Sequence, residues 1–195
     1  KWRKHFQGIW LTIGVALGIY ITDFSNWSNI LFFITYILGL LCVTSLADRS
    51  PKSGNYLGLA SNVGVVFTNF CFGNFGLAFA GVYYGITHIL GLFTWTKKEN
   101  QDKDGRIKTE EMNKAGLILT GIFILFGIIL MMRFGSLFGI ERGSDPAFYW
   151  MNIIAFVVGI VSQLLMILRK PISWWGWFLT NFIWFYLDVS AGNTW

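Results

Sequence analysis

Long apolar runs separated by polar joints dominate the chain. A helix of about 20 apolar residues, each rising about 1.5 Å, spans the hydrocarbon core of a bilayer. Seven runs reach roughly that length, and we predict spans at 7–24, 28–47, 55–73, 75–95, 114–137, 148–168 and 173–192. Most joints are short, whereas 96–114 and 135–147 are longer. The pattern predicts an all-α polytopic membrane protein with seven transmembrane helices.

Composition supports this class. Of the 195 residues, 54% are hydrophobic and 13% are charged, whereas soluble domains carry about 25% charged residues. Cys42 and Cys71 lie in apolar runs, so we expect free core thiols and no metal site. The basic start Lys1–Lys4 leads into no small-residue cleavage site, so no cleavable signal peptide is expected. No cofactor and no nucleic-acid partner is predicted.

The positions of Lys and Arg predict the orientation. Of the fifteen Lys and Arg residues, all but Arg133 and Arg142 fall in the N-terminal tail and in the second, fourth and sixth joints. Basic residues concentrate on the cytoplasmic side of membrane proteins. We therefore predict a cytoplasmic N-terminus and an external C-terminus, and we interpret the formal charge of +5 as a topology signal.

The third and seventh predicted spans resemble each other. At a shift of 119 residues Ser61-Asn62 meets Thr180-Asn181 and Asn69 meets Asp188, and at a shift of 120 Arg49-x-Pro51 meets Arg169-x-Pro171. Three helices reverse the chain, so two parallel repeats need a further helix between them. We predict one domain, 1–195, with two three-helix bundles at 7–73 and 114–192, joined by a linker helix at 75–95.

The last span carries the candidate site. Asn181 and Asp188 are seven residues apart, as are Trp177 and Trp184, so all four lie toward one helical side. Polar groups in a bilayer are costly and usually mark a site. Aromatic rings and an amide suit a flat cationic or uncharged ring. The alternative for Trp174 and its neighbour Trp175 is an interfacial aromatic belt.

The repeats extend this site to the first half of the chain. Parallel repeats typically place a central site between the halves, so Asn62 would face Asn181, and Asn69 with Asp188 would form a second layer. Gln163 is a further substrate-binding candidate, and a satisfied interhelical hydrogen bond is its alternative role. For His88 we favour packing or hydrogen bonding over proton transfer.

Arg169-Lys170 followed by Trp174-x-x-Trp177-x-x-x-Asn181 resembles the last helix of bacterial nicotinamide riboside transporters, the PnuC family. The 3+1+3 organisation is similar to this family and to the distantly related SWEET sugar transporters. The resemblance implies a homotrimer in the bacterial inner membrane that moves nicotinamide riboside by facilitated diffusion, with cytoplasmic phosphorylation trapping the vitamin. It also implies substrate binding by Trp174, Trp177 and Asn181.

The residues agree with that substrate. Stacked Trp rings favour a pyridinium cation, and Asn can pair with a carboxamide. No Lys or Arg lies deep in a span, which argues against the mononucleotide. A transporter of sugars or other neutral solutes and a structural or receptor-like membrane protein are the alternatives, and ion coupling through Asp188 stays open. No Ser/His/Asp arrangement, Cys/His spacing or phosphate loop indicates an enzyme.

The polar joint carries one more pattern. Asn100-x-Asp102-x-Asp104-Gly105-Arg106, ending at Glu111, has the spacing of an EF-hand calcium loop. Asn in the first position and Lys108 in the ninth weaken it, as do the neighbouring lysines. We expect a solvated connector without a calcium site.

Overall fold

The computed structural model describes residues 2–71, 75–143 and 145–190, without the side chains of residues 2, 3 and 188. Within these ranges the chain forms seven α-helices and no named strand, and two 3-10 turns, η1 (Lys98–Asn100) and η2 (Gly135–Phe138), follow α4 and α5. An isolated bridge pairs Gln101 with Ile107. The helices are α1 (Trp2–Ile21), α2 (Trp27–Ala47), α3 (Ser53–Cys71), α4 (Phe75–Trp95), α5 (Lys114–Phe134), α6 (Pro146–Ile167) and α7 (Ser173–Ser190).

Each predicted span corresponds to one helix, and the all-helical prediction is confirmed. The first boundary is wrong, because α1 begins at Trp2 and not at residue 7, and ends at Ile21. Hydropathy missed the first turn of α1, residues 2–6, because its basic residues are polar, although Lys and Arg are good helix formers. The helix ends where the Thr22 hydroxyl donates to the Gly18 carbonyl and Asp23 accepts the Ser25 amide. Such local side-chain bonds compete with helix continuation.

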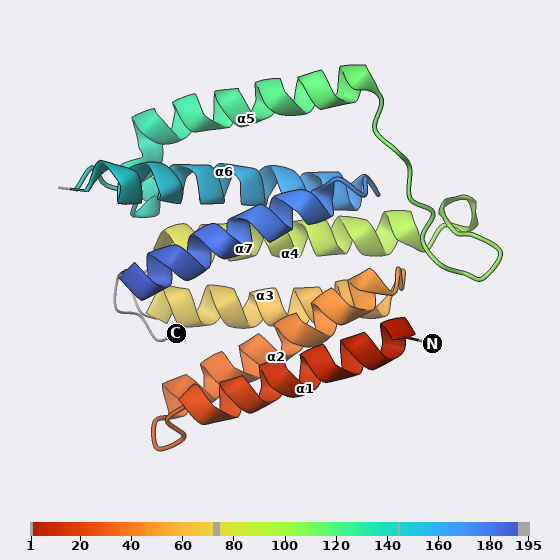
Figure 1. Ribbon diagram of the computed structural model, residues 1–195, viewed down its shortest axis with the longest axis horizontal. Helices are drawn as coiled ribbons and strands as arrows, with labels where there is room; N and C mark the ends of the chain where they lie inside the picture. The colour runs from red at the N-terminus through yellow and green to blue at the C-terminus, as the bar shows by residue number, and fades with distance from the viewer. Residues whose placement is uncertain (1, 72–74, 144, 191–195) are drawn as a thin grey trace. The chain divides into compact units, whose positions relative to one another are not determined.

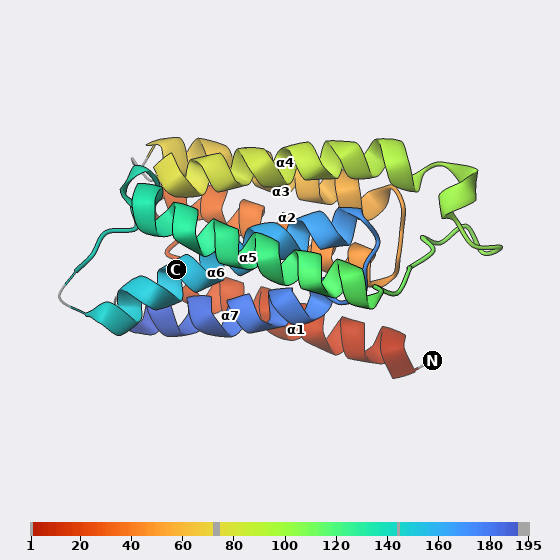
Figure 2. The ribbon, with the colours of Figure 1, turned by 90° about the horizontal axis from the view of Figure 1, so that it is seen from above.

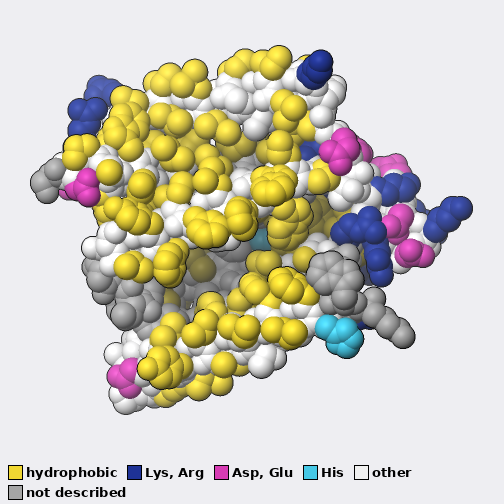
Figure 3. Space-filling model, in the orientation of Figure 1, with side chains coloured by type: hydrophobic (Ala, Val, Ile, Leu, Met, Phe, Trp, Pro, Cys, Tyr) yellow, Lys and Arg dark blue, Asp and Glu magenta, His cyan; other side chains and the backbone are white. Residues whose placement is uncertain are grey.

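In the part of the chain that the structure describes, four helices are long and apolar enough to cross a membrane by length and composition: α2, α4, α5 with its η2 extension, and α6. α1, α3 and α7 include more polar residues, so their crossing stays a prediction. In the face shown in Figure 3, apolar side chains run along the helices and charged side chains lie near their ends. This distribution suits a lipid-facing surface, since charged groups are costly inside a bilayer.

The chain divides into two compact units. The first contains α1 to α3, α4 from Leu77 onward and the chain to Lys108, and the second contains residues 74–76 and 109–195. In the first unit α2 packs against both α1 and α3, and in the second α6 packs against both α5 and α7 (Figure 1). The helices of each unit therefore pair in the same order along the chain.

Within the first unit, α3 and α4 run side by side (Figure 2). A Cβ added at Gly81 of α4 would meet Val65 and Val66 of α3, and one added at Gly85 would meet Leu59 and Asn62. Small residues allow this close approach of two membrane helices. The roles of 75–95 as a linker helix and of 7–73 and 114–192 as repeats stay predictions.

The corners after α2 and α6 have the same backbone. Arg49 and Arg169 are the two described non-glycine residues with positive φ, at 58° and 60°. The Arg49 amide donates to the Leu46 carbonyl at 2.9 Å, and the Arg169 amide donates to the Met166 carbonyl at 2.8 Å. The next amide in each corner reaches back five residues, to Ser45 and Leu165. Both corners are helix C-terminal caps of the left-handed type, and the left-handed residue costs about 1–2 kcal/mol when it is not glycine.

Candidate functional site

α7 packs in its unit through a stripe of residues seven apart. Ser173, Thr180 and Leu187 are 2%, 0% and 3% exposed. Gly176 belongs to the same side, because a Cβ there would collide with the Ser162 hydroxyl of α6. The backbone of α7 therefore approaches α6 closely at this point, and the approach sets the rotation of α7 about its own axis.

The predicted site residues lie beside this packed stripe. Trp174, Trp177, Asn181 and Trp184 follow each other at spacings of three and four, so they share one helical face. Trp177 and Trp184 are half-buried, whereas Trp174 and Asn181 are exposed. Within the described ranges the Asn181 amide has no hydrogen-bond partner. The face thus offers two half-buried indole rings and an exposed amide whose donors and acceptor are unused by the described residues.

Asp188 also belongs to this face by spacing, but its side chain lies outside the described residues. Gln163 of α6 is buried and its side chain is already engaged. A buried, engaged Gln163 is compatible with both alternatives, an interhelical hydrogen bond and a role in substrate binding. The roles of Asp188 and Gln163 in substrate binding stay predictions.

The asparagines of α3 differ from Asn181. The Asn62 amide donates to the Gly58 carbonyl at 2.8 Å, and the Asn69 amide donates to the Val65 carbonyl at 2.9 Å. Each amide nitrogen is thus used by its own helix, and the amide oxygen remains as the acceptor. Asn62 is half-buried and Asn69 is buried. The matching positions in the two repeats could not reveal that the α3 amides are bonded within their own helix. That Asn62 faces Asn181 stays a prediction.

A buried polar pair joins α3 to α4. His88 Nδ1 lies 3.1 Å from Asn55 Oδ1, and the Asn55 amide donates to the Pro51 carbonyl. Asn55 is fully buried. Glycines make room on both helices, since a Cβ at Gly58 would meet the His88 ring and one at Gly91 would meet Asn55. The interpretation of His88 as a hydrogen-bonding residue is confirmed, and the seven-residue spacing of Asn55, Asn62 and Asn69 could have indicated its partner.

The calcium-like loop uses its carboxylate for other contacts. Asp102 Oδ1 accepts the amides of Asp104 and Arg106, and Asp102 Oδ2 lies 3.3 Å from Arg49 Nη2. The backbone hydrogen bond from Arg106 is the largest cause that lowers the pKa of Asp102. The Asn100 amide donates to the Thr94 carbonyl. Among described residues no group of three or more His, Cys, Asp or Glu could hold a metal ion, so the loop is built as a turn.

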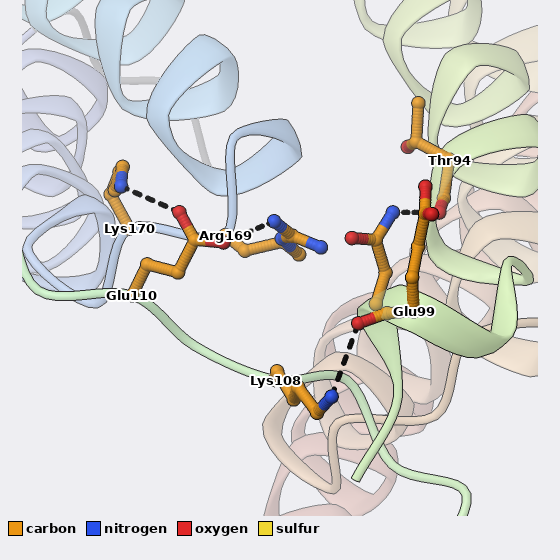
Figure 4. Close-up of polar contacts among 7 residues, drawn as sticks. Thr94, Glu99, Lys108, Glu110, Arg169 and Lys170 are labelled. Atoms are coloured by element: carbon orange, nitrogen blue, oxygen red, sulfur yellow. Dashed lines mark hydrogen bonds and ion pairs between the residues drawn. The ribbon is translucent and has the colours of Figure 1, made fainter.

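A second carboxylate in the same segment binds the corner after α6. Glu110 accepts from Arg169 and, at 3.0 Å, from the Lys170 amine (Figure 4). The hydrogen bond from Lys170, followed by the charge of Arg169, lowers the pKa of Glu110. Glu110 is therefore an ion-pair partner outside the helices, and α5 begins four residues later with Asn113 as its cap.

Comparisons with known proteins agree on one family. A family model described as "Nicotinamide mononucleotide transporter" matches residues 29–195. The chain is 24% identical over 185 residues to the nicotinamide riboside transporter PnuC of Neisseria mucosa, covering 92% of this chain and 66% of that protein. It therefore spans slightly less than two thirds of that relative.

A crystal structure of the vitamin B3 transporter PnuC has the same fold, with a TM-score of 0.72 and 20% sequence identity, covering 96% of this chain and 78% of that one. The predictions of a multi-pass membrane protein of the transporter class, and not an enzyme, agree with these matches. Because the family model covers most of the sequence, including the Trp–Asn face of α7, the chain belongs to the nicotinamide mononucleotide transporter family.

Proposed function

We propose that this protein carries nicotinamide riboside across a bacterial inner membrane by facilitated diffusion. The observation that carries the proposal is the face of α7 with Trp174, Trp177, Asn181 and Trp184, which lies within the segment matched by the family model. The name of the Neisseria mucosa relative gives the same substrate.

The chemistry of the face suits the riboside. Its planar pyridinium cation stacks on an indole ring, an interaction worth about 0.5–1 kcal/mol when exposed and about 2 kcal/mol or more when desolvated. Among the described residues Asn181 has no hydrogen-bond partner, and its amide offers both a donor and an acceptor, the complement of a carboxamide. On α3, the amide oxygen of Asn62 is suited to accept a hydrogen bond from a ribose hydroxyl.

Charge favours the riboside over the mononucleotide. A phosphate is ordinarily bound by Arg, Lys or a helix N-terminus. Neither α3 nor α7 contains a Lys or Arg, and the family model's description does not decide which of the two compounds this chain moves. An uncharged ribose matches the asparagines and aromatic rings of these helices better than a phosphate dianion does.

The transport cycle in this proposal is alternating access between two parallel three-helix repeats. The identical corners at Arg49 and Arg169 and the identical pairing order of the helices support the repeats. The proposal includes the predicted 3+1+3 order, cytoplasmic N-terminus, external C-terminus and homotrimer. Phosphorylation of the riboside after entry would keep the gradient inward.

Calorimetric binding of nicotinamide riboside to the purified protein tests the site. Trp177→Ala and Asn181→Ala should each weaken binding by about tenfold or more, since tenfold corresponds to about 1.4 kcal/mol. Trp175→Ala is the matched control, because Trp175 is 72% exposed and lies off the face. Equal affinity of all three variants and the wild type would contradict the assignment, and binding of glucose in place of the riboside would favour the sugar-transporter alternative.

A further inference from the structure

The loop between α4 and α5, residues 96–113, is held at two neighbouring points. In the first unit the Ile107 amide donates to the Arg49 carbonyl at 3.0 Å, and in the second unit the Glu110 amide donates to the Arg169 carbonyl at 3.1 Å. Only Lys108 and Thr109 separate these donors along the chain. The boundary between the two units falls between those two residues, so each unit holds its own end of the loop.

The two acceptors are equivalent in sequence and in conformation. Arg49 and Arg169 are 120 residues apart, each precedes an x-Pro, and each has the left-handed φ that ends its helix. Glycine is the residue that adopts this conformation most readily. Arginine at both places therefore indicates that the side chain has a role that glycine could not supply.

The side chains show that role. Arg49 Nη2 lies 3.3 Å from Asp102 Oδ2, and Arg49 Nη1 donates to the Ile107 carbonyl at 3.3 Å. Arg169 pairs with Glu110, which Lys170 also contacts (Figure 4). Each arginine thus holds the loop twice, through its carbonyl and through its guanidinium. We call these two sets of contacts the latches.

We propose that Arg49 and Arg169 are equivalent positioning residues, whose latches fasten the α4–α5 loop to each unit and set the turnover of transport without touching the substrate. The inference rests on the proposed function, because it concerns the motion of one repeat against the other. An extended chain gains only about 3.3–3.6 Å per residue, so two intervening residues give little slack. A motion that separates the latches must therefore carry the loop along or open a latch.

The test uses the full chain in lipid nanodiscs and in proteoliposomes. Asp102→Asn/Glu110→Gln removes both carboxylate charges, and the amide oxygen introduced by Asp102→Asn still accepts from the Asp104 and Arg106 amides. Lys103→Gln is the control, since it changes one charge on the same exposed loop. Arg49→Lys/Arg169→Lys keeps the positive charges that face Asp102 and Glu110. The latches should therefore be preserved in this second control.

Two readouts are measured. In hydrogen exchange, peptides covering the Ile107 and Glu110 amides should exchange roughly threefold to tenfold faster in the Asp102→Asn/Glu110→Gln protein, the range expected for one lost hydrogen bond. In uptake assays, the same protein should bind nicotinamide riboside with unchanged affinity and turn over roughly threefold to tenfold more slowly. Arg49→Lys/Arg169→Lys and Lys103→Gln should match the wild type in both.

Unchanged hydrogen exchange in the Asp102→Asn/Glu110→Gln protein would refute the existence of the latches. Parallel loss of affinity and turnover, or a slow Lys103→Gln protein, would overturn the positioning role. Failure of the wild type to bind the riboside would instead refute the proposed function, and the exchange experiment, which needs no substrate, would still decide whether the latches exist.

Discussion

The contact between Gly176 and Ser162 sets the position of the candidate site, and Gly176→Ala tests it. A Cβ at residue 176 would collide with Ser162 Oγ and would lie 3.0 Å from Ser162 Cβ and 3.6 Å from Val158 Cγ1. Ser162 is buried, and its hydroxyl donates to the Val158 carbonyl at 2.6 Å. The added methyl therefore has to displace the hydroxyl or push α7 away from α6.

The magnitude follows from two opposing effects. Overpacking of a packed interior costs about 1–3 kcal/mol, whereas replacing glycine by alanine within a helix gains about 0.5–1 kcal/mol. We expect Gly176→Ala to lower the free energy of unfolding by about 0–2.5 kcal/mol, the difference between these two ranges. Gly121→Ala in α5, where a Cβ meets nothing within 4 Å, receives only the gain and serves as the control.

Ser162→Ala removes the colliding oxygen, so the double variant should recover most of the loss. Residues in direct contact show coupling energies of about 0.5–3 kcal/mol in such cycles. Thermal unfolding in detergent gives the stability of each protein, and calorimetry gives its affinity for nicotinamide riboside. Because Trp177 is the next residue, affinity should fall in Gly176→Ala and return in the double variant. Zero coupling, or identical behaviour of Gly176→Ala and Gly121→Ala, would refute the close approach.

Three further predictions concern the first unit and the α4–α5 loop. His88→Leu leaves the buried Asn55 oxygen without its partner and should cost about 1–3 kcal/mol in thermal unfolding, whereas unchanged stability would contradict the pairing. The pKa of Glu110 is lowered by Lys170 and Arg169, so its stabilising contribution is present above the usual glutamate pKa of 4.5 and is lost as the pH falls through the lower folded value. The difference in unfolding temperature between wild type and Glu110→Gln should therefore vanish in acid, and a difference that grows there would oppose this sign. Calcium should leave uptake unchanged, because Asp102 is already occupied by two amides and Arg49; micromolar binding that disappears in Asp102→Ala/Asp104→Ala would show the reverse.

Hydropathy and spacing were enough to predict the helices and the composition of the α7 face. The length of each apolar run determines where a helix can form, and spacings of three and four place Trp174, Trp177, Asn181 and Trp184 on one side. The same spacing rule did not show that Ser173, Thr180 and Leu187 form the packed stripe beside them. Both stripes repeat every seven residues, so periodicity alone does not tell which of them faces a neighbouring helix.

Tertiary contacts explain the remaining differences. The collisions that a Cβ would make at Gly58 and Gly176 depend on how closely two helices approach, and a glycine in a membrane helix does not reveal its neighbour. The equivalence of Arg49 and Arg169 was visible as a repeated Arg-x-Pro. Their left-handed backbone was not visible in the sequence. Their contacts with the α4–α5 loop join residues up to 59 positions apart, beyond the reach of local patterns.

Uptake of labelled nicotinamide riboside into sealed proteoliposomes, without ATP and with or without an imposed ion gradient, tests the central claim most directly. We predict that the riboside equilibrates across the membrane at the same rate in both conditions and that the mononucleotide stays outside. Trp177→Ala and Asn181→Ala should slow riboside uptake, whereas Trp175→Ala should not. Entry of the mononucleotide in preference to the riboside, or accumulation of unmodified riboside against its own gradient, would contradict it.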